Sequence, residues 1–147
     1  MQMLDYPPIW LFGFLGLAWA QAVLLPTAWG EGWAPVVGGL VALAGAGVMV
    51  AALPQFLRAR TTMVPHRDPA ALITSGVYRI SRNPIYLGDV LIFAGLAIRW
   101  QAWVAFLLVP LFMAVLTRRF IRPEEARLHA RFGQEFTSWA ARTRRWI

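Results

Sequence analysis

The sequence predicts an all-α integral membrane protein with about four transmembrane helices, a helical hairpin and a cytoplasmic C-terminal amphipathic helical region. Of the 147 residues, 59% are hydrophobic, and the mean hydropathy is +0.54. Soluble domains contain only roughly 45–50% apolar residues. Two blocks, Pro7–Gly30 and Gly32–Leu57, carry no charged residue. Each exceeds the about 20 apolar residues that cross a hydrocarbon core, so both are predicted to span the membrane.

The four expected spans follow one another along the chain. The first covers about Pro7–Trp29, and the second about Ala34–Leu57. The third, Pro84–Ile98, is short, because 15 residues rise only about 22 Å as a helix. We therefore expect its start to lie inside the protein rather than at the lipid surface. The fourth covers about Trp100–Thr117 and forms a helical hairpin with the third.

The arginines set the expected orientation. All 14 basic residues are arginine, and the net charge is +7. With four spans, all of them except Arg99 fall on the side that holds both termini. The positive-inside rule makes that side cytoplasmic, which predicts a bacterial inner-membrane protein with cytoplasmic termini. Arginines that flank apolar blocks indicate the lipid bilayer, and not nucleic acid, as the partner.

Small residues recur in the second span at Gly38, Ala42 and Ala46. This spacing lets helix backbones approach closely. It favours packing within the chain and leaves a homodimer open, so the protein is expected to be a monomer or a homodimer.

The C-terminal part has the pattern of two short helices. Pro123 suits a first helical turn, and Glu124 favours the positive end of the helix dipole. The first helix is expected to end before Gly133, and the second covers about Glu135–Arg142. The arginines and tryptophans beyond it favour a lipid interface.

A polar segment between the second and third spans is the main candidate for a ligand site. Residues Thr74–Gly88 have the sequence TSGVYRISRNPIYLG. Asn83 and Tyr86 are three residues apart and share a helix face, and Gly76 permits a positive φ. Together with Glu124, on the same expected side, this segment offers donors, acceptors and aromatic rings to a zwitterionic ligand.

The sequence lacks the residues that thiol-based, metal-based and serine-based catalysis require. Cysteine is absent, which excludes a thiol nucleophile and a cysteine-based metal site. The two histidines, His66 and His129, are too isolated to suggest a metal pair. Ser75 and Ser81 have no evident histidine and carboxylate partners, so acyl transfer and metal-assisted hydrolysis have little support.

The pattern S-G-V-Y-R-x-S-R-N-P-x-Y-L-G, followed about 40 residues later by E-E-x-x-L-x-x-x-F-G, resembles the isoprenylcysteine carboxyl methyltransferase and phospholipid N-methyltransferase superfamily. The similarity covers roughly Pro65–Ile147. It implies an enzyme that uses S-adenosylmethionine and releases S-adenosylhomocysteine. The acceptor would be lipophilic, such as an isoprenylcysteine-like carboxylate, a phospholipid amine or a small amphiphile. The chain would form one domain, with two N-terminal spans in 1–57 and a cofactor-binding core in 58–147.

The resemblance also assigns site residues. Those implied in cofactor binding are Ala71, Leu72, Ile73, Gly76, Tyr78, Arg82, Asn83, Pro84, Ile85, Tyr86, Leu87 and Glu124. The resemblance implies one substrate-facing arginine in catalysis, with Arg119 and Arg122 as alternatives. A substrate amine would have to lose a proton, and Glu125 or a water is expected to accept it. Asn83 stands where the family has a histidine, which removes a titratable group and keeps hydrogen-bonding capacity.

Two other functions stay open. The segment Tyr86–Asp89 also resembles the C-terminal region of sterol reductases, which use NADPH. A non-enzymatic membrane scaffold is the third alternative. Asp89 itself lies one turn into an apolar block, where carboxylates are either paired or functional. We therefore expect it to form a structural ion pair, to snorkel, or to serve the substrate.

Overall fold

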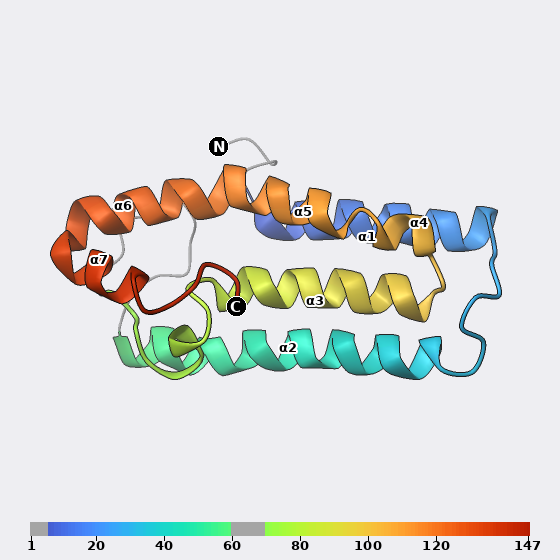
Figure 1. Ribbon diagram of the computed structural model, residues 1–147, viewed down its shortest axis with the longest axis horizontal. Coiled ribbons are helices and arrows are strands. Elements are labelled where there is room, and N and C mark those ends of the chain that lie inside the picture. The colour runs from blue at the N-terminus through green and yellow to red at the C-terminus, as the bar shows by residue number, and fades with distance from the viewer. Residues whose placement is uncertain (1–5, 60–69) are drawn as a thin grey trace.

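The helices of the protein lie side by side along its long axis (Figure 1). The structure is a computed structural model that describes residues 6–59 and 70–147. In those residues the regular structure is entirely helical, which confirms the predicted fold class. The bundle consists of α1 (Pro7–Leu24), α2 (Ala34–Ala59), α3 (Pro84–Arg99), α4 (Trp103–Phe106) and α5 (Val109–Leu116).

Three helical stretches in the described part are long and apolar enough to cross a membrane. They are Pro7–Leu24, Ala34–Ala59 and Trp103–Phe132. The third predicted span, α3, has only 16 residues. It contacts α1, α2, α4 and α5, and it lies between α2 and α5 in Figure 1. The short length of the third span predicted that its start lies inside the protein, and α3 does lie at the centre of the bundle.

Small residues hold α2 and α3 together. A Cβ added at Gly45 would lie 2.7 Å from the carbonyl oxygen of Gly88, and one at Gly95 would lie 2.6 Å from that of Gly38. Both distances are shorter than any ordinary contact, so the two backbones approach as closely as glycine allows. At Gly38, the small-residue spacing of the second span therefore serves packing within the chain.

Aromatic rings fill the space between α1, α3 and α5. Phe14, Phe93 and Phe112 contact one another with ring centroids 4.8–5.5 Å apart. Such pairs contribute about 0.5–1.5 kcal/mol each beyond the burial of their area. Neither Phe93 nor Phe112 has exposed surface. This core fixes the position of α3 and hence of the polar segment that precedes it.

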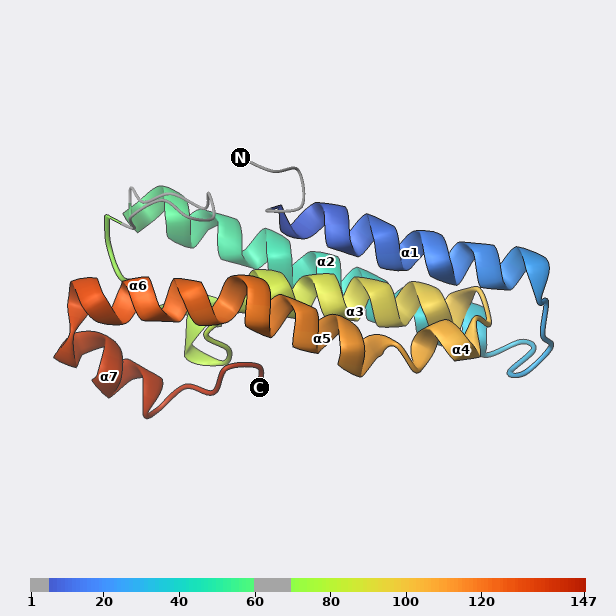
Figure 2. The ribbon, with the colours of Figure 1, turned by 90° about the horizontal axis from the view of Figure 1, so that it is seen from above.

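The fourth predicted span and the first C-terminal helix form one rod, where the sequence suggested two separate elements. After α5, a π-helical turn, η3 (Thr117–Ile121), leads directly into α6 (Arg122–Phe132), as Figure 2 shows. Pro123 explains the turn, because a proline ring clashes with the carbonyl four residues earlier and lacks an N–H. The wider π turn relieves that conflict, and the N–H of Arg122 donates to the carbonyl of Thr117.

The chain then reverses direction. Gly133, with φ of 49°, ends α6, and α7 (Gln134–Ala140) folds back. The last residues return to the start of α3 (Figure 1). At the opposite end of the bundle, Gln101 closes the turn of the hairpin with φ of 56°. Its carbonyl accepts hydrogen bonds from Thr27 Oγ1 at 2.7 Å and Trp29 Nε1 at 3.0 Å.

Candidate active site

Tyr86 connects the two halves of the sequence motif. Its hydroxyl donates a hydrogen bond to Glu124 Oε2 at 3.1 Å, across 38 positions of sequence. The ring stacks on Phe120, with centroids 6.2 Å apart and planes 25° apart. Phe120 lies on the π turn, and Glu124 lies in the first turn of α6. The junction of these two elements therefore places the carboxylate over the first turn of α3.

Tyr78 is a second buried aromatic residue close to Glu124. It lies on the short 3-10 helix η2 (Gly76–Arg79) and packs with Ala52, Phe136 and Trp139. Trp139 Nε1 donates to its backbone carbonyl at 3.2 Å. Burial, with a smaller effect from the charge of Glu124, raises the pKa of the Tyr78 phenol far above its ordinary value. Tyr78 is therefore a neutral hydrogen-bonding group at physiological pH.

Gly76 shapes the loop that carries Tyr78. Its φ is 60°, a conformation that residues with a side chain rarely adopt. A Cβ at this position would also collide with the amide of Gln55 on α2. Ser75 Oγ donates to Gln55 Oε1 at 2.9 Å. Sequence reasoning anticipated the glycine but missed Gln55, which has no motif to mark it.

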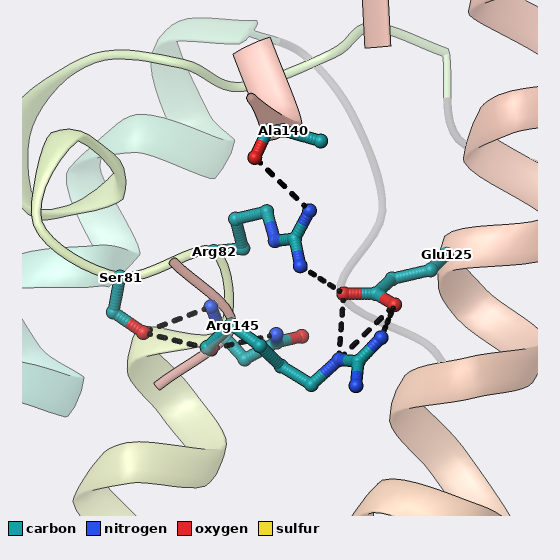
Figure 3. A network of polar contacts seen from close by, with 6 residues as sticks. Ser81, Arg82, Glu125, Ala140 and Arg145 are labelled. Atoms are coloured by element: carbon teal, nitrogen blue, oxygen red, sulfur yellow. Dashed lines mark hydrogen bonds and ion pairs between the residues drawn. The ribbon is translucent and has the colours of Figure 1, made fainter. Parts of the chain in front are cut away.

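The C-terminal tail covers the segment before α3 (Figure 3). Ser81 Oγ and Asn83 Nδ2 both donate to the carbonyl of Arg145, at 3.3 and 3.0 Å. The N–H of Arg82 donates to the carbonyl of Arg144 at 3.0 Å, and that of Asn83 donates to Ser81 Oγ at 3.1 Å. Ser81 and Asn83 are consequently only 1% and 7% exposed. The tail thus binds the backbone of Arg82 and the amide of Asn83, two residues that were predicted to bind the cofactor.

Glu125 is the centre of an ion-pair network (Figure 3). Arg145 donates to it through Nε at 3.1 and 3.2 Å and through Nη2 at 2.6 Å. Arg82 Nη2 lies 3.3 Å from Glu125 Oε1, and Arg82 Nη1 donates to the carbonyl of Ala140 at 3.4 Å. The hydrogen bonds to Glu125 raise the pKa of the Arg145 guanidinium. These contacts join α6, the tail and the segment before α3, and a role of Glu125 in proton transfer stays a prediction.

Asp89 differs from both glutamates. It lies on α3, three residues beyond Tyr86, and is only 3% exposed. Within the described residues, no hydrogen bond or ion pair reaches its carboxylate. Burial in the bundle also excludes snorkelling. Of the three expectations for Asp89, the structural ion pair and the snorkelling side chain are not observed.

The other predicted residues lie around this centre. Leu72, Ile73 and Ile85 pack against the cluster of Tyr78. Pro84 is buried in the first turn of α3, and Ala71 and Leu87 are half-buried. The guanidinium of Arg119 lies 5.4 Å from the ring centroid of Trp10 on α1, whereas Arg122 is exposed. Their catalytic roles stay predictions. His66 lies outside the described residues.

Sequence reasoning did not assign the tail to the site. Its arginines were interpreted as lipid anchors, yet Arg145 binds Glu125 and its carbonyl binds Asn83. A backbone carbonyl leaves no mark in a sequence, so only the pairing of Glu125 with a distant arginine could have indicated the contact. Among residues 6–59 and 70–147, no three histidine, aspartate or glutamate side chains gather in a way that could hold a metal ion.

Comparison with known proteins gives one match. A family model described as phospholipid methyltransferase matches residues 33–135, which is more than half of the chain. No curated protein and no solved structure matches. The matched region contains Tyr86 and Glu124 and leaves out α1 and the tail that binds Asn83. The resemblance in the motif is thereby confirmed, and the chain belongs to the phospholipid methyltransferase family.

Proposed function

We propose that this protein transfers a methyl group from S-adenosylmethionine to a lipophilic acceptor at the cytoplasmic end of its helix bundle, in a bacterial inner membrane. The observation that carries the proposal is the hydrogen bond from Tyr86 to Glu124, 3.1 Å long. It joins the two halves of the motif within the region that matches the methyltransferase family. That family favours methyl transfer over the reductase and scaffold alternatives.

The groups around this hydrogen bond suit the charges of the cofactor. Its ammonium group would bind the carboxylate of Glu124, and the buried rings of Tyr78 and Tyr86 suit a sulfonium cation. The buried Arg82 Nε has no hydrogen-bond partner among residues 6–59 and 70–147, so it could donate to the cofactor carboxylate. When bound, the cofactor supplies an activated methyl group. The residues of the chain have to orient it, exclude water and hold the acceptor in line.

The acceptor is proposed to arrive from the bilayer. Tyr86 and Asp89 lie on the first turns of a central helix whose neighbours α1, α2 and α5 are apolar. A lipophilic acceptor would reach this depth between helices, whereas the polar cofactor would enter at the bundle end that carries α6 and the tail. Isoprenylcysteine-like carboxylates, phospholipid amines and small amphiphiles all fit that description.

Titration of S-adenosylhomocysteine into the full-length protein in uncharged maltoside micelles tests the proposal by calorimetry. The wild type is expected to bind it saturably. Glu124→Gln should weaken binding by about 1.5–3 kcal/mol, the range for hydrogen bonds to charged groups. Glu135→Gln, which removes an exposed carboxylate on α7, is the matched control and should bind like the wild type. A folded wild type that binds NADPH but no S-adenosylhomocysteine would overturn the proposal.

A further inference from the structure

Arg145 in the C-terminal tail (residues 141–147) makes polar contacts with two separate elements (Figure 3). Its guanidinium donates three hydrogen bonds, at 2.6, 3.1 and 3.2 Å, to Glu125 in the first turn of α6. Its backbone carbonyl accepts from Ser81 Oγ at 3.3 Å and from Asn83 Nδ2 at 3.0 Å, just before α3. One residue of the tail therefore bridges the start of α6 and the start of α3.

The same two helix starts carry the central pair of the candidate active site. Glu124 precedes Glu125 on α6, and Tyr86 follows Asn83 by three residues on α3. The bridge through Arg145 thus spans the same gap as the hydrogen bond from Tyr86 to Glu124, which is 3.1 Å long. The distance between these two side chains depends on how the two helix starts are placed relative to each other.

Packing holds α6 less firmly than it holds the helices of the bundle. No residue of α6 is fully buried, and α6 contacts mainly η3 and α7. Its position over α3 then depends on polar contacts, because Glu124 binds Tyr86 while Glu125 binds Arg82 and Arg145. A cofactor ammonium that replaced the hydroxyl of Tyr86 at Glu124 would remove the first of these contacts. The contacts of Glu125 would then have to keep α6 in place.

The tail itself is firmly attached. Thr143 is 6% exposed, and Trp146 packs against the core between α1, α3 and α5. Between these two residues, the carbonyl of Arg144 accepts from the N–H of Arg82 at 3.0 Å. A guanidinium fixed in this way, and donating through Nε and Nη2, holds a carboxylate in one orientation, which a flexible ammonium would not. Arg145 therefore has the geometry of a group that orients α6.

We propose that Arg145 is a positioning residue of the methyl-transfer site. It holds Glu125, and with it the first turn of α6, so that Glu124 meets Tyr86 and the bound cofactor. The inference rests on the proposed function and deepens it, since it extends the site into a tail outside the family match of residues 33–135. Arg145 acts on the cofactor through Glu124 and needs no contact of its own, as supporting residues behind a binding group do.

The first test replaces the guanidinium and keeps the carbonyl. Full-length Arg145→Gln in maltoside micelles should bind S-adenosylhomocysteine about 10-fold more weakly than the wild type, within the range of couplings inside one hydrogen-bond network. Arg145→Lys keeps the charge but loses the planar fork, and it should recover part of the affinity. Arg144→Gln, which removes an exposed arginine from the same tail, is the matched control and should bind like the wild type. Wild-type affinity in Arg145→Gln would overturn the inference.

A double-mutant cycle separates positioning from a general effect on stability. If Arg145 acts through Glu124, Arg145→Gln should cause no further loss of affinity in a protein that already carries Glu124→Gln. An equal loss in both backgrounds would mean that Arg145 acts independently of Glu124, and the inference would be wrong. A purely structural role would lower the melting temperature in both backgrounds and leave the affinity of the folded protein unchanged. Arg145→Lys, which keeps a cation beside Glu125, carries the same cycle if Arg145→Gln does not fold.

A third measurement needs no cofactor. The chain contains three tyrosines, and Tyr86→Phe identifies the signal of Tyr86 among their ζ-carbon NMR resonances. This signal reports the hydrogen bond to Glu124, so Arg145→Gln should shift it in the same direction as Glu124→Gln, and Arg144→Gln should leave it in place. A signal that does not move in Arg145→Gln would contradict the inference. A wild type that binds no S-adenosylhomocysteine but shows this shift would instead refute the proposed function alone.

Discussion

The half-buried carboxylate of Glu125 and the buried carboxylate of Asp89 have opposite surroundings. Glu125 receives three hydrogen bonds from Arg145 and an ion pair from Arg82. Asp89 receives no hydrogen bond or ion pair from any described residue. One carboxylate thus binds segments of the chain to one another, and the other binds none of the described residues. The contrast indicates that burial alone does not identify a functional carboxylic acid. The hydrogen-bond and ion-pair partners of the carboxylate within the protein have to be considered as well.

The largest expected effect comes from breaking the Glu125 network. Glu125→Gln leaves two arginines without their counter-charge. The free energy of unfolding should fall by about 1.5–3 kcal/mol, the range for hydrogen bonds to charged groups, because Glu125 is half-buried and Arg145 is 35% exposed. Unfolding in mixed micelles measures the change. A variant as stable as the wild type would show that the network contributes nothing, and the contrast with Asp89 would disappear.

A smaller effect is expected where α3 meets α2, the contact that keeps Asp89 in the bundle. Gly45→Ala places a methyl group 2.7 Å from the carbonyl oxygen of Gly88. The helices must separate, which should cost about 1–3 kcal/mol of stability. Gly47→Ala is the matched control, since its added Cβ meets nothing within 4 Å. Equal melting temperatures of the two variants would contradict the close approach.

A third change tests the tail independently of Glu125. Asn83→Ala removes the amide that donates to the carbonyl of Arg145 and leaves the hydroxyl of Ser81 as its remaining donor. The expected loss of stability is about 1 kcal/mol, that of one hydrogen bond. Asn83→His, which introduces the family residue, should lose less because an imidazole N–H can replace the amide. Thermal unfolding of the three proteins should rank them in that order.

The smallest expected effect is at Asp89 in the absence of ligand. Asp89→Asn should leave the free energy of unfolding unchanged or raise it slightly, because no partner loses a contact. The same measurement on Glu125→Gln provides the comparison. A clear loss of stability in Asp89→Asn would mean that the carboxylate has a structural partner, and both carboxylates would then belong to the scaffold.

Much of the bundle could be predicted from the sequence. Charge-free blocks locate α1 and α2, and Pro84 marks the first turn of α3. The joining of α5 to α6 could not be predicted, because Pro123 normally signals a helix start and a π turn has no sequence pattern of its own. The resemblance placed Tyr86 and Glu124 at one cofactor site, and the direct hydrogen bond between them is a finding of the structure.

The other features of the site depend on how the helices and the tail pack, and this packing leaves no pattern in a single sequence. Asn83 and Ser81 bind a backbone carbonyl, and any residue type at that position of the tail would present one. The isolation of Asp89 among the described residues depends on which face of α3 is buried. Both are properties of the assembled bundle.

The π turn also determines how α6 is rotated about its axis relative to α5. Each residue of an α-helix turns the chain by about 100°, and a π turn inserts the equivalent of one additional residue into the helix. If Thr117–Ile121 adopted regular α geometry with the same number of residues, α6 would be rotated by about that angle. Glu124 would then leave Tyr86, and Glu125 would leave Arg82, although every side chain of both contacts would still be present.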